Sequence, residues 1–381
     1  MKPRKSKLQW KTSLARRIAN DPPAPDEIEV SIFGPGKGEA IAVHLGNSQW
    51  ITVDSCRDQS TKQNPTLEYF SRIGVEVARD VRLVVGTHAH DDHIAGISEI
   101  FAAARDAQFV TSTALTSTEF YASVVADADI ESQLRQSVRA EYRKVILEAR
   151  DRGKFPDGRR PILKALEQKE LWSRSADRDV PYSRVVALSP SDEAIDRSME
   201  LLRQGSARVD SRRRLSVGDP NEYAVALWIE IGDVSVLLGA DLITGPKDCG
   251  WNAVLTSHSP ATKASMHKVP HHGSINAHHP DVWSELLDSE VISLMAPFRA
   301  GRTMLPTQSD IERVASRSSE TYLTAKPGVP TATDSVRKTK AALSGIATDV
   351  REPYGQVGHV RARHNAGGWT VETFAPAYAI A

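Results

Sequence analysis

The sequence predicts a mixed α/β fold, because short strand-like runs alternate with helical runs along the chain. The strand-like runs are rich in β-branched and apolar residues and are separated by turn residues. They occupy residues 28–33, 40–45, 50–53, 82–86, 184–188, 223–231, 234–238, 266–269 and 291–296, and a hairpin at 359–363 and 369–374. Helical runs lie at 94–105, 131–150 and 310–316. Such alternation is typical of α/β architectures.

The first strands follow a clear boundary. The run Asp21-Pro22-Pro23-Ala24-Pro25 interrupts any helix, so residues 1–26 are predicted to be an N-terminal tail or leading helix, and 27–381 the folded domain. Residues 82–86 (RLVVG) form a short run of mainly apolar residues. Such a run is typical of a strand that helices cover on both faces of its sheet.

The middle of the chain, about 105–183, is predicted to be a helical insertion. Val138, Tyr142 and Val145 recur at helical spacing within 131–150. Residues 131–184 contain 14 Lys and Arg against nine Asp and Glu. The insertion is therefore locally basic, although a solvated helical face is an equally good interpretation of that charge.

Composition excludes several classes of protein. Lys and Arg together number 48, as do Asp and Glu, so the chain lacks the basic character of a dedicated nucleic-acid binder. Cys56 and Cys249 form no CxxC pair, which argues against a thiolate zinc site. No run of 18 or more apolar residues and no apolar signal core occur. We therefore expect no membrane association and a cytoplasmic location.

Four potential metal ligands directly follow the strand-like run 82–86. They are His88, His90, Asp92 and His93, three imidazoles and a carboxylate within six residues. Imidazole nitrogen and carboxylate oxygen suit zinc and similar ions. In a tight loop after a strand, His88 and His90 can serve one ion, and Asp92 and His93 another. Solvated loop histidines are the alternative, but four ligands at this spacing favour the metal site.

The H-x-H-x-D-H motif resembles the signature of the metallo-β-lactamase superfamily. Asp54 at the end of an early strand, Asp241 at the end of a later one, and the pair His271-His272 follow in the family's order. The resemblance covers residues 28–100 and about 184–330. It implies a four-layer αββα sandwich with two zinc ions, or Mn²⁺, at one edge.

The same resemblance implies roles for individual residues. Asp241 is expected to bridge the two ions and, with Asp92, to act in catalysis. Either His271 or His272 supplies the last ligand. We favour His271, with His272 facing the substrate or supporting the site, and the reverse assignment stays open.

Three segments are similar to the metallo-β-lactamase domain of ComEC-type DNA-uptake proteins. They are Gly36-Lys37-Gly38-Glu39-Ala40, Leu237-Leu238-Gly239-Ala240-Asp241, and His267-Lys268-Val269-Pro270-His271-His272-Gly273-Ser274. A phosphate-binding loop is the alternative for the first segment, but it lacks the ending of a P-loop and precedes a strand. Lys268 is either a phosphate contact or an ordinary strand-edge lysine.

Two departures from the family pattern stand out. Many members carry a histidine between the first cluster and the bridging aspartate, whereas here Asn221 precedes the corresponding strand. The G-H-P motif of ComEC-like members is replaced by Gly301–Pro306, which contains no histidine. One ion is then expected to have an open position, filled by water.

The sequence therefore predicts a metal-dependent hydrolase that acts on a phosphodiester, such as nucleic acid, through a metal-activated water. The alternative is an impaired binding or regulatory component of a multi-protein system, for example a defence module. Basic residues of the insertion are candidates for a nucleic-acid groove or for docking a protein partner. They are Arg135, Arg139, Arg143, Arg150, Arg152, Arg159, Arg160 and Lys164, with Arg212, Arg213 and Arg214 further along.

Overall fold

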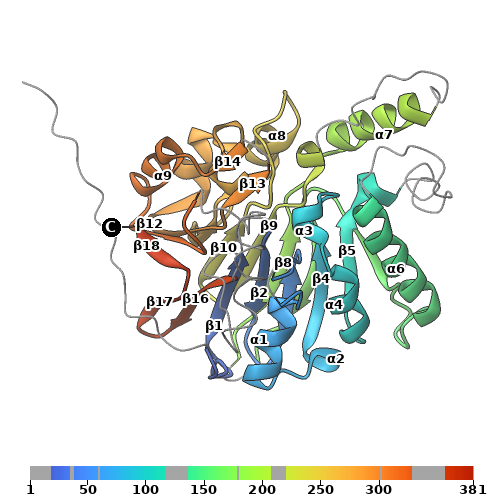
Figure 1. Ribbon diagram of the computed structural model, residues 1–381, viewed down its shortest axis with the longest axis horizontal. Helices are drawn as coiled ribbons and strands as arrows, with labels where there is room; N and C mark the ends of the chain where they lie inside the picture. Colours follow the sequence, from blue (N-terminus) through green and yellow to red (C-terminus); the bar gives the residue numbers. More distant parts are fainter. Residues whose placement is uncertain are drawn as a thin grey trace, which may run out of the picture.

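The computed structural model describes residues 19–34, 38–58, 61–116, 136–177, 180–206, 220–300, 303–327 and 357–380. Two eight-stranded sheets form its centre (Figure 1). The first sheet, in spatial order, consists of β17 (Gly368–Phe374), β16 (Gly358–Asn365), β1 (Ile28–Gly34), β2 (Ala40–His44), β3 (Trp50–Val53), β4 (Val81–Gly86), β5 (Gln108–Ser112) and β6 (Ile162–Ala165). The second consists of β18 (Tyr378–Ile380), β15 (Glu320–Leu323), β12 (Leu287–Met295), β11 (Ala264–Lys268), β10 (Val234–Leu238), β9 (Leu227–Ile231), β8 (Ser183–Ala187) and β7 (Lys169–Arg174).

The two sheets pack face to face through their inward apolar side chains. Val43 and Leu83 from the first sheet share one buried cluster with Ile229, Met266 and Leu294 from the second. Each of these side chains is less than a tenth exposed. Removing this apolar surface from water is the main force that holds the sandwich together.

Helices cover the outer faces of both sheets. Phe70 of α1, Phe101 of α4 and Val138 of α6 pack on the first sheet, and Trp251 of α8 packs on the second. Figure 1 shows α4 and α6 beside the first sheet, and α8 and α9 on the other side of the molecule. The helices are α1 (Pro65–Ile73), α2 (Val77–Asp80), α3 (Asp91–Ile94), α4 (Ile97–Ala103), α6 (Gln136–Arg152), α7 (Asp192–Ser206), α8 (Gly250–Ser257) and α9 (Gln308–Ala315). The predicted αββα sandwich is thus confirmed.

Short turns and a hairpin complete the described elements. The strands β13 (Phe298–Ala300) and β14 (Thr303–Leu305) form a separate two-stranded hairpin. The helical turns are η1 (Thr113–Thr116), η2 (Pro220–Tyr223), η3 (Pro270–Gly273), η4 (Ile275–Ala277) and η5 (Val282–Leu286). Among the described residues, no helix combines the length and apolar character needed to cross a membrane.

The range 105–183 differs from the helical insertion predicted for it. In its described part, α6 is its one α-helix, while β5 and β6 extend the first sheet and β7 lies at the edge of the second. The parallel pairing of β4, β5 and β6 explains the difference. The short apolar runs of β5 and β6 continue the sheet rather than stand apart from it.

The N-terminal tail predicted for residues 1–26 also needs correction for its described part, which begins at Ala19. Ala19 is buried, and the Asp21 carboxylate accepts hydrogen bonds from Arg361 and Arg363 on β16. These ion pairs attach the segment around Asp21 to β16, the second strand of the first sheet.

Candidate metal centre

The predicted ligands come together where parallel strands of both sheets end. β3 and β4 run parallel in the first sheet, and β10 and β11 run parallel in the second. Asp54 follows β3, His88 follows β4, Asp241 follows β10, and His272 follows β11. The carboxyl ends of parallel strands lie at the same edge of a sheet, so the site occupies one edge of the sandwich.

The backbone at these strand ends is strained. Asp54, Ala240, His271 and His272 have φ values of 59°, 46°, 47° and 52°. Residues other than glycine rarely adopt this left-handed conformation, and it concentrates at functional sites. Here it turns each chain sharply after its strand and directs the following side chains toward the edge of the sandwich.

Four side-chain atoms converge on one position. His93 Nε2 lies 3.3 Å from Asp241 Oδ2 and 3.8 Å from Asp92 Oδ2. His272 Nε2 lies 3.4 Å from Asp241 Oδ2 and 3.5 Å from Asp92 Oδ2. Ligands placed 2.0–2.2 Å from a tetrahedral zinc ion are about 3.3–3.6 Å from one another. The four separations between an imidazole nitrogen and a carboxylate oxygen, 3.3–3.8 Å, are thus close to the spacing that such an ion requires.

Hydrogen bonds orient both imidazoles of this set. His93 Nδ1 donates to Asp54 Oδ2 at 2.7 Å, and His272 Nδ1 donates to the carbonyl oxygen of Ala296 at 2.9 Å. Each ring therefore directs its Nε2 atom into the cluster, where neither atom has a hydrogen-bond partner. A carboxylate or carbonyl behind the second ring nitrogen is the usual arrangement for a metal-binding histidine. The residues present fit a metal ion.

His88 and His90 lie beside this position. A ring nitrogen of His88 is within 4.8 Å of ligand atoms of His93 and Asp241, and His88 Nε2 lies 3.0 Å from His90 Nδ1. The Thr87 hydroxyl donates to Asp54, so it accepts a hydrogen bond from His88 Nδ1. His88 Nε2 is therefore an acceptor, and here it accepts a hydrogen bond from His90 Nδ1. The structure thus brings His88, His90, Asp92, His93 and Asp241 together, as the sequence predicts.

The positions of His271 and His272 are the reverse of those we favoured, in which His271 was the ligand. His272 is buried within the cluster, whereas the His271 ring binds Asn276 through Nδ1 at 2.9 Å and Asn221 through Nε2 at 3.4 Å. The left-handed backbone at both residues sends consecutive side chains in different directions. The geometry therefore favours His272 as the ligand and places His271 with Asn221 beside the site.

Charges within the cluster shift the pKa values of its members. Burial opposes a charge on His93 and His272, but nearby carboxylates, with Asp241 foremost, raise the pKa of His93 well above its usual value and that of His272 to about 10. Burial, followed by the neighbouring His93 and His90, lowers the pKa of His88 well below its usual value. Despite its burial, Asp241 has a pKa well below the usual range because of His93 and His272.

The sequence prediction gave Glu39 no role and left Lys268 as either a phosphate contact or an ordinary strand-edge lysine. Lys268 is fully buried and ion-paired with Glu39, so it is neither an exposed strand-edge lysine nor open to a phosphate. Phe298 on β13 stacks on His272, with ring centroids 5.0 Å apart. Nothing in the spacing of these residues along the chain reveals that they meet.

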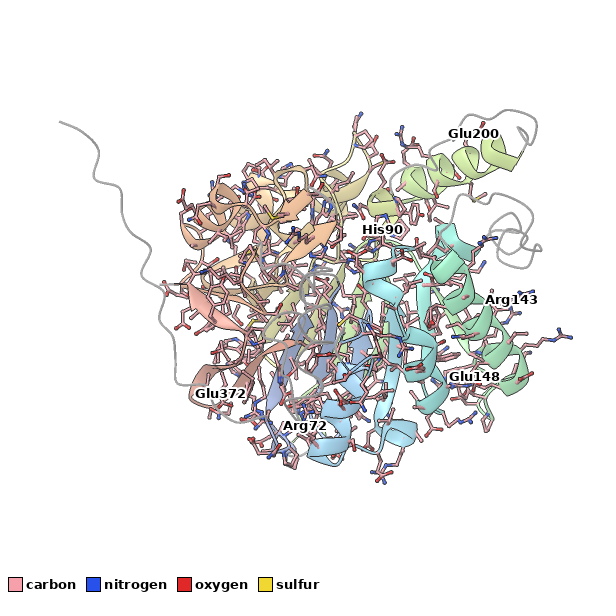
Figure 2. All side chains as sticks on the ribbon, viewed as in Figure 1. Arg72, His90, Arg143, Glu148, Glu200 and Glu372 are labelled. Atoms are coloured by element: carbon pink, nitrogen blue, oxygen red, sulfur yellow. The ribbon has the colours of Figure 1, made fainter. Side chains whose placement is uncertain are left out.

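The basic residues of the predicted insertion are spread over different surroundings. The Arg152 guanidinium donates to the carbonyls of Ala104 and Ala107 and lies over the Phe101 ring, so it attaches α6 to α4. Arg143 is exposed on the outer side of α6, whereas His90 lies near the middle of the molecule (Figure 2).

Several residues named above lie outside the described residues: Gly36, Lys37, Arg135, Arg212, Arg213, Arg214, Gly301 and Arg302.

The chain has structural similarity of limited extent to solved proteins. No protein-family model and no curated protein matches the chain. Among solved structures, it is similar to the metallo-β-lactamase-fold protein YhfI from Bacillus subtilis, with 14% identity and a TM-score of 0.38 over 78% of this chain and 95% of that one. It is also similar to CmlA, a diiron β-hydroxylase from Streptomyces venezuelae, with 15% identity and a TM-score of 0.34 over 71% of this chain and 45% of that one.

A third similar structure is the short form of human tRNase Z, with 10% identity and a TM-score of 0.31 over 63% of this chain and 76% of that one. A variant of CmlA is matched over only 36% of its own length. Likeness of this extent identifies no activity for this chain.

Proposed function

We propose that the chain is a metal-dependent hydrolase that acts on a phosphodiester, with nucleic acid as a candidate substrate. One observation carries the proposal: carboxylate oxygens of Asp92 and Asp241 each lie 3.3–3.8 Å from the Nε2 atoms of His93 and His272, close to the spacing of metal ligands. A buried, charged cluster with unpartnered imidazole nitrogens is costly unless a ligand completes it.

Two ions are proposed, with Zn²⁺ the first candidate and Mn²⁺ the second. Asp92, His93, Asp241 and His272 would hold one ion. His88 and His90 would hold the other, with Asp241 shared between the two. When bound, such ions lower the pKa of water and stabilise charge that develops on the substrate. Asp54 and Thr87 keep the rings of His93 and His88 in the orientation that metal binding needs.

The proposed phosphodiester substrate is supported by the three segments similar to ComEC-type domains and by the exposed arginines Arg143 and Arg150 of α6. A polyanion is attracted by such side chains, and its binding then depends strongly on salt. The same helix is our candidate docking surface for a protein partner, and a cytoplasmic location remains part of the proposal.

A binding or regulatory component without turnover is the second candidate, and Asn221 is the observation that favours it. Asn221 is buried and contacts His271, where many family members have a further histidine ligand. An amide is a weaker metal ligand than an imidazole for zinc. A metal-loaded protein that binds polyanions without cleaving them would support this candidate.

Elemental analysis of the purified protein, followed by assays on phosphodiesters and nucleic acids with Zn²⁺ and Mn²⁺, tests the proposal. We expect up to two transition-metal ions per chain, and reduced metal content in the His88→Ala/His90→Ala variant. Full retention of metal in that variant would remove both histidines from the site. Metal binding without cleavage of any phosphodiester would refute the proposed activity.

A further inference from the structure

A buried ion pair lies directly behind the four-ligand position and connects the two sheets. Lys268 ends β11 of the second sheet, and Glu39 precedes β2 of the first. Their side chains are 1% exposed, and the ammonium contacts Glu39 Oε1. A buried ion pair contributes little stability beyond that of an apolar pair of similar size. Stability alone therefore does not account for these charges.

Lys268 contacts the segment that presents Asp241. Its Nζ atom donates a hydrogen bond to the Ala240 carbonyl oxygen at 2.7 Å and lies 3.6 Å from Asp241 Oδ1. The other carboxylate oxygen, Oδ2, faces His93 and His272. The ammonium thus stabilises the strained turn at Ala240 and attracts the oxygen of Asp241 that points away from the two imidazoles.

Glu39 reaches the remaining three ligands of the position. Its backbone N–H donates to the Asp92 carbonyl oxygen at 3.0 Å. Its carboxylate lies 3.8 Å from His93 Nδ1 and 3.7 Å from His272 Nδ1. The preceding Gly38 permits this approach, because a Cβ atom there would lie 2.8 Å from the Asp92 carbonyl oxygen.

We propose that Glu39 and Lys268 are positioning residues that hold Asp92, His93, Asp241 and His272 in place across the two sheets. Neither residue is assigned a contact with substrate. They hold the ligand loops in place in the metal-free protein. The loops therefore lose less conformational freedom when a metal binds. The inference rests on the proposed metal centre and adds a role for two residues outside its ligand set.

A charge-neutral double variant, Glu39→Gln/Lys268→Met, separates positioning from structural support. It keeps the net charge and approximate volume and leaves no buried charge alone, so the metal-free protein should unfold cooperatively near the wild-type Tm. Co²⁺ titration should nevertheless show affinity reduced roughly 10–100-fold, the effect typical of residues that orient metal ligands. The visible absorption spectrum of bound Co²⁺ should also change.

The double variant Arg184→Met/Glu230→Gln is the matched control. It removes an ion pair between β8 and β9 that contacts no member of the cluster, so Co²⁺ affinity and spectrum should remain those of the wild type. Wild-type affinity and spectrum in the Glu39→Gln/Lys268→Met variant would overturn the inference while leaving the metal centre intact. A wild-type protein that takes up no Co²⁺ would overturn both.

If the double variant does not fold, the single variant Glu39→Asp tests the positioning role instead. It keeps the negative charge next to Lys268 but withdraws the carboxylate by one methylene group. The same titration applies: weaker Co²⁺ binding with an altered spectrum supports the positioning role, and an unchanged titration overturns it.

Discussion

Two regions of the described structure that bury charged groups differ in how completely those groups are hydrogen-bonded. We call Asp21, Glu29, Arg361, Arg363 and Glu372 the outer-face network, because they lie on or against the outer part of the first sheet. Arg363 Nε donates to the fully buried Glu29 at 2.8 Å, and Arg361 donates to Asp21 and Glu372. Two hydroxyl groups, from Tyr69 and Ser31, complete the hydrogen bonds of Glu29.

The cluster of Asp92, His93, Asp241 and His272 is more deeply buried than the outer-face network, whose Asp21 side chain is 64% exposed, and its hydrogen bonding differs. His93 Nε2, His272 Nε2 and Asp241 Oδ1 are buried atoms without a hydrogen-bond partner, whereas no atom of the outer-face network is in this state among the described residues. Buried polar groups are nearly always paired in folded proteins. The difference indicates that the outer-face network supports the fold and that the cluster is organised for a ligand.

Asp241→Asn should have the largest effect on activity. The amide keeps the volume but replaces a carboxylate oxygen that faces His93 and His272 with a weaker ligand. We expect turnover to fall by more than the roughly 100-fold upper range for residues that only orient ligands. Metal content should fall with it, while the circular dichroism spectrum stays the same.

Asp91→Asn is the matched control for Asp241→Asn. Asp91 lies in the same loop between the predicted ligands but belongs to none of the candidate metal-binding groups of the described residues. Its variant should keep wild-type activity. Wild-type turnover in Asp241→Asn would remove that residue from the site.

Arg363→Met should have the largest effect on stability and none on the metal centre. It removes the cation beside the fully buried Glu29, which then keeps only hydroxyl donors. Leaving a buried charge without its partner costs about 3–5 kcal/mol of unfolding free energy. Chemical denaturation measures this loss, and adding Glu29→Gln should recover much of it. Weakened metal binding in Arg363→Met would show that the two regions are coupled.

Metal addition should stabilise the protein through the cluster alone. A metal at 100 times its Kd adds about 2.7 kcal/mol to the free energy of unfolding. Arg363→Met should gain the same increment as the wild type, whereas Asp241→Asn should gain little. Thermal unfolding of metal-free protein with increasing Zn²⁺ measures the gain. An equal increment in all three proteins would place the metal elsewhere.

The metal-free cluster should make stability depend on pH in a definite direction. The carboxylates raise the pKa of His272 to about 10 and that of His93 above its usual value. Their contribution is complete below the unfolded pKa of about 6.5 and is lost as pH rises toward 10. Metal-free protein should therefore become less stable over this interval, as denaturation at several pH values would reveal.

Metal binding should respond to pH in the opposite direction. Because a metal replaces the protons on His93 and His272, its affinity should increase with pH and binding should release protons. Calorimetric titration in buffers with different ionisation enthalpies measures that release. The outer-face network provides the contrast, since none of its members has to lose a proton when metal binds. Metal uptake without proton release would contradict the assigned ligands.

The sequence was sufficient to predict the sandwich and most of the cluster. Apolar runs define the strands, and His88, His90, Asp92 and His93 are adjacent in the chain, so local spacing reveals them. The choice of His272 over His271 depends on a left-handed backbone that residue order does not encode. The ion pair of Glu39 and Lys268 forms only when strands from different sheets meet, so no local pattern predicts it.

The smallest predicted effect concerns the basic face of α6, which belongs to neither buried region. Arg139→Glu/Arg143→Glu should leave metal content nearly unchanged, because neither residue is a candidate metal ligand. Arg143 is exposed, whereas Arg139 has a buried Nε atom, so we expect a modest loss of stability from its charge reversal. If these arginines neutralise phosphates of a nucleic acid, binding weakens for all sequences. The slope of the logarithm of binding affinity against the logarithm of salt concentration then decreases in magnitude by roughly one for each phosphate that is no longer neutralised.

Arg72→Glu is the matched control for the α6 variant, since it reverses an exposed arginine in the last turn of α1 rather than on α6. It should alter nucleic-acid binding less than Arg139→Glu/Arg143→Glu does. Equal binding and cleavage by the wild type and the α6 variant, at both low and moderate salt, would exclude α6 from the substrate path. The cluster would then more reasonably serve a small phosphodiester that reaches the metal edge without touching that helix.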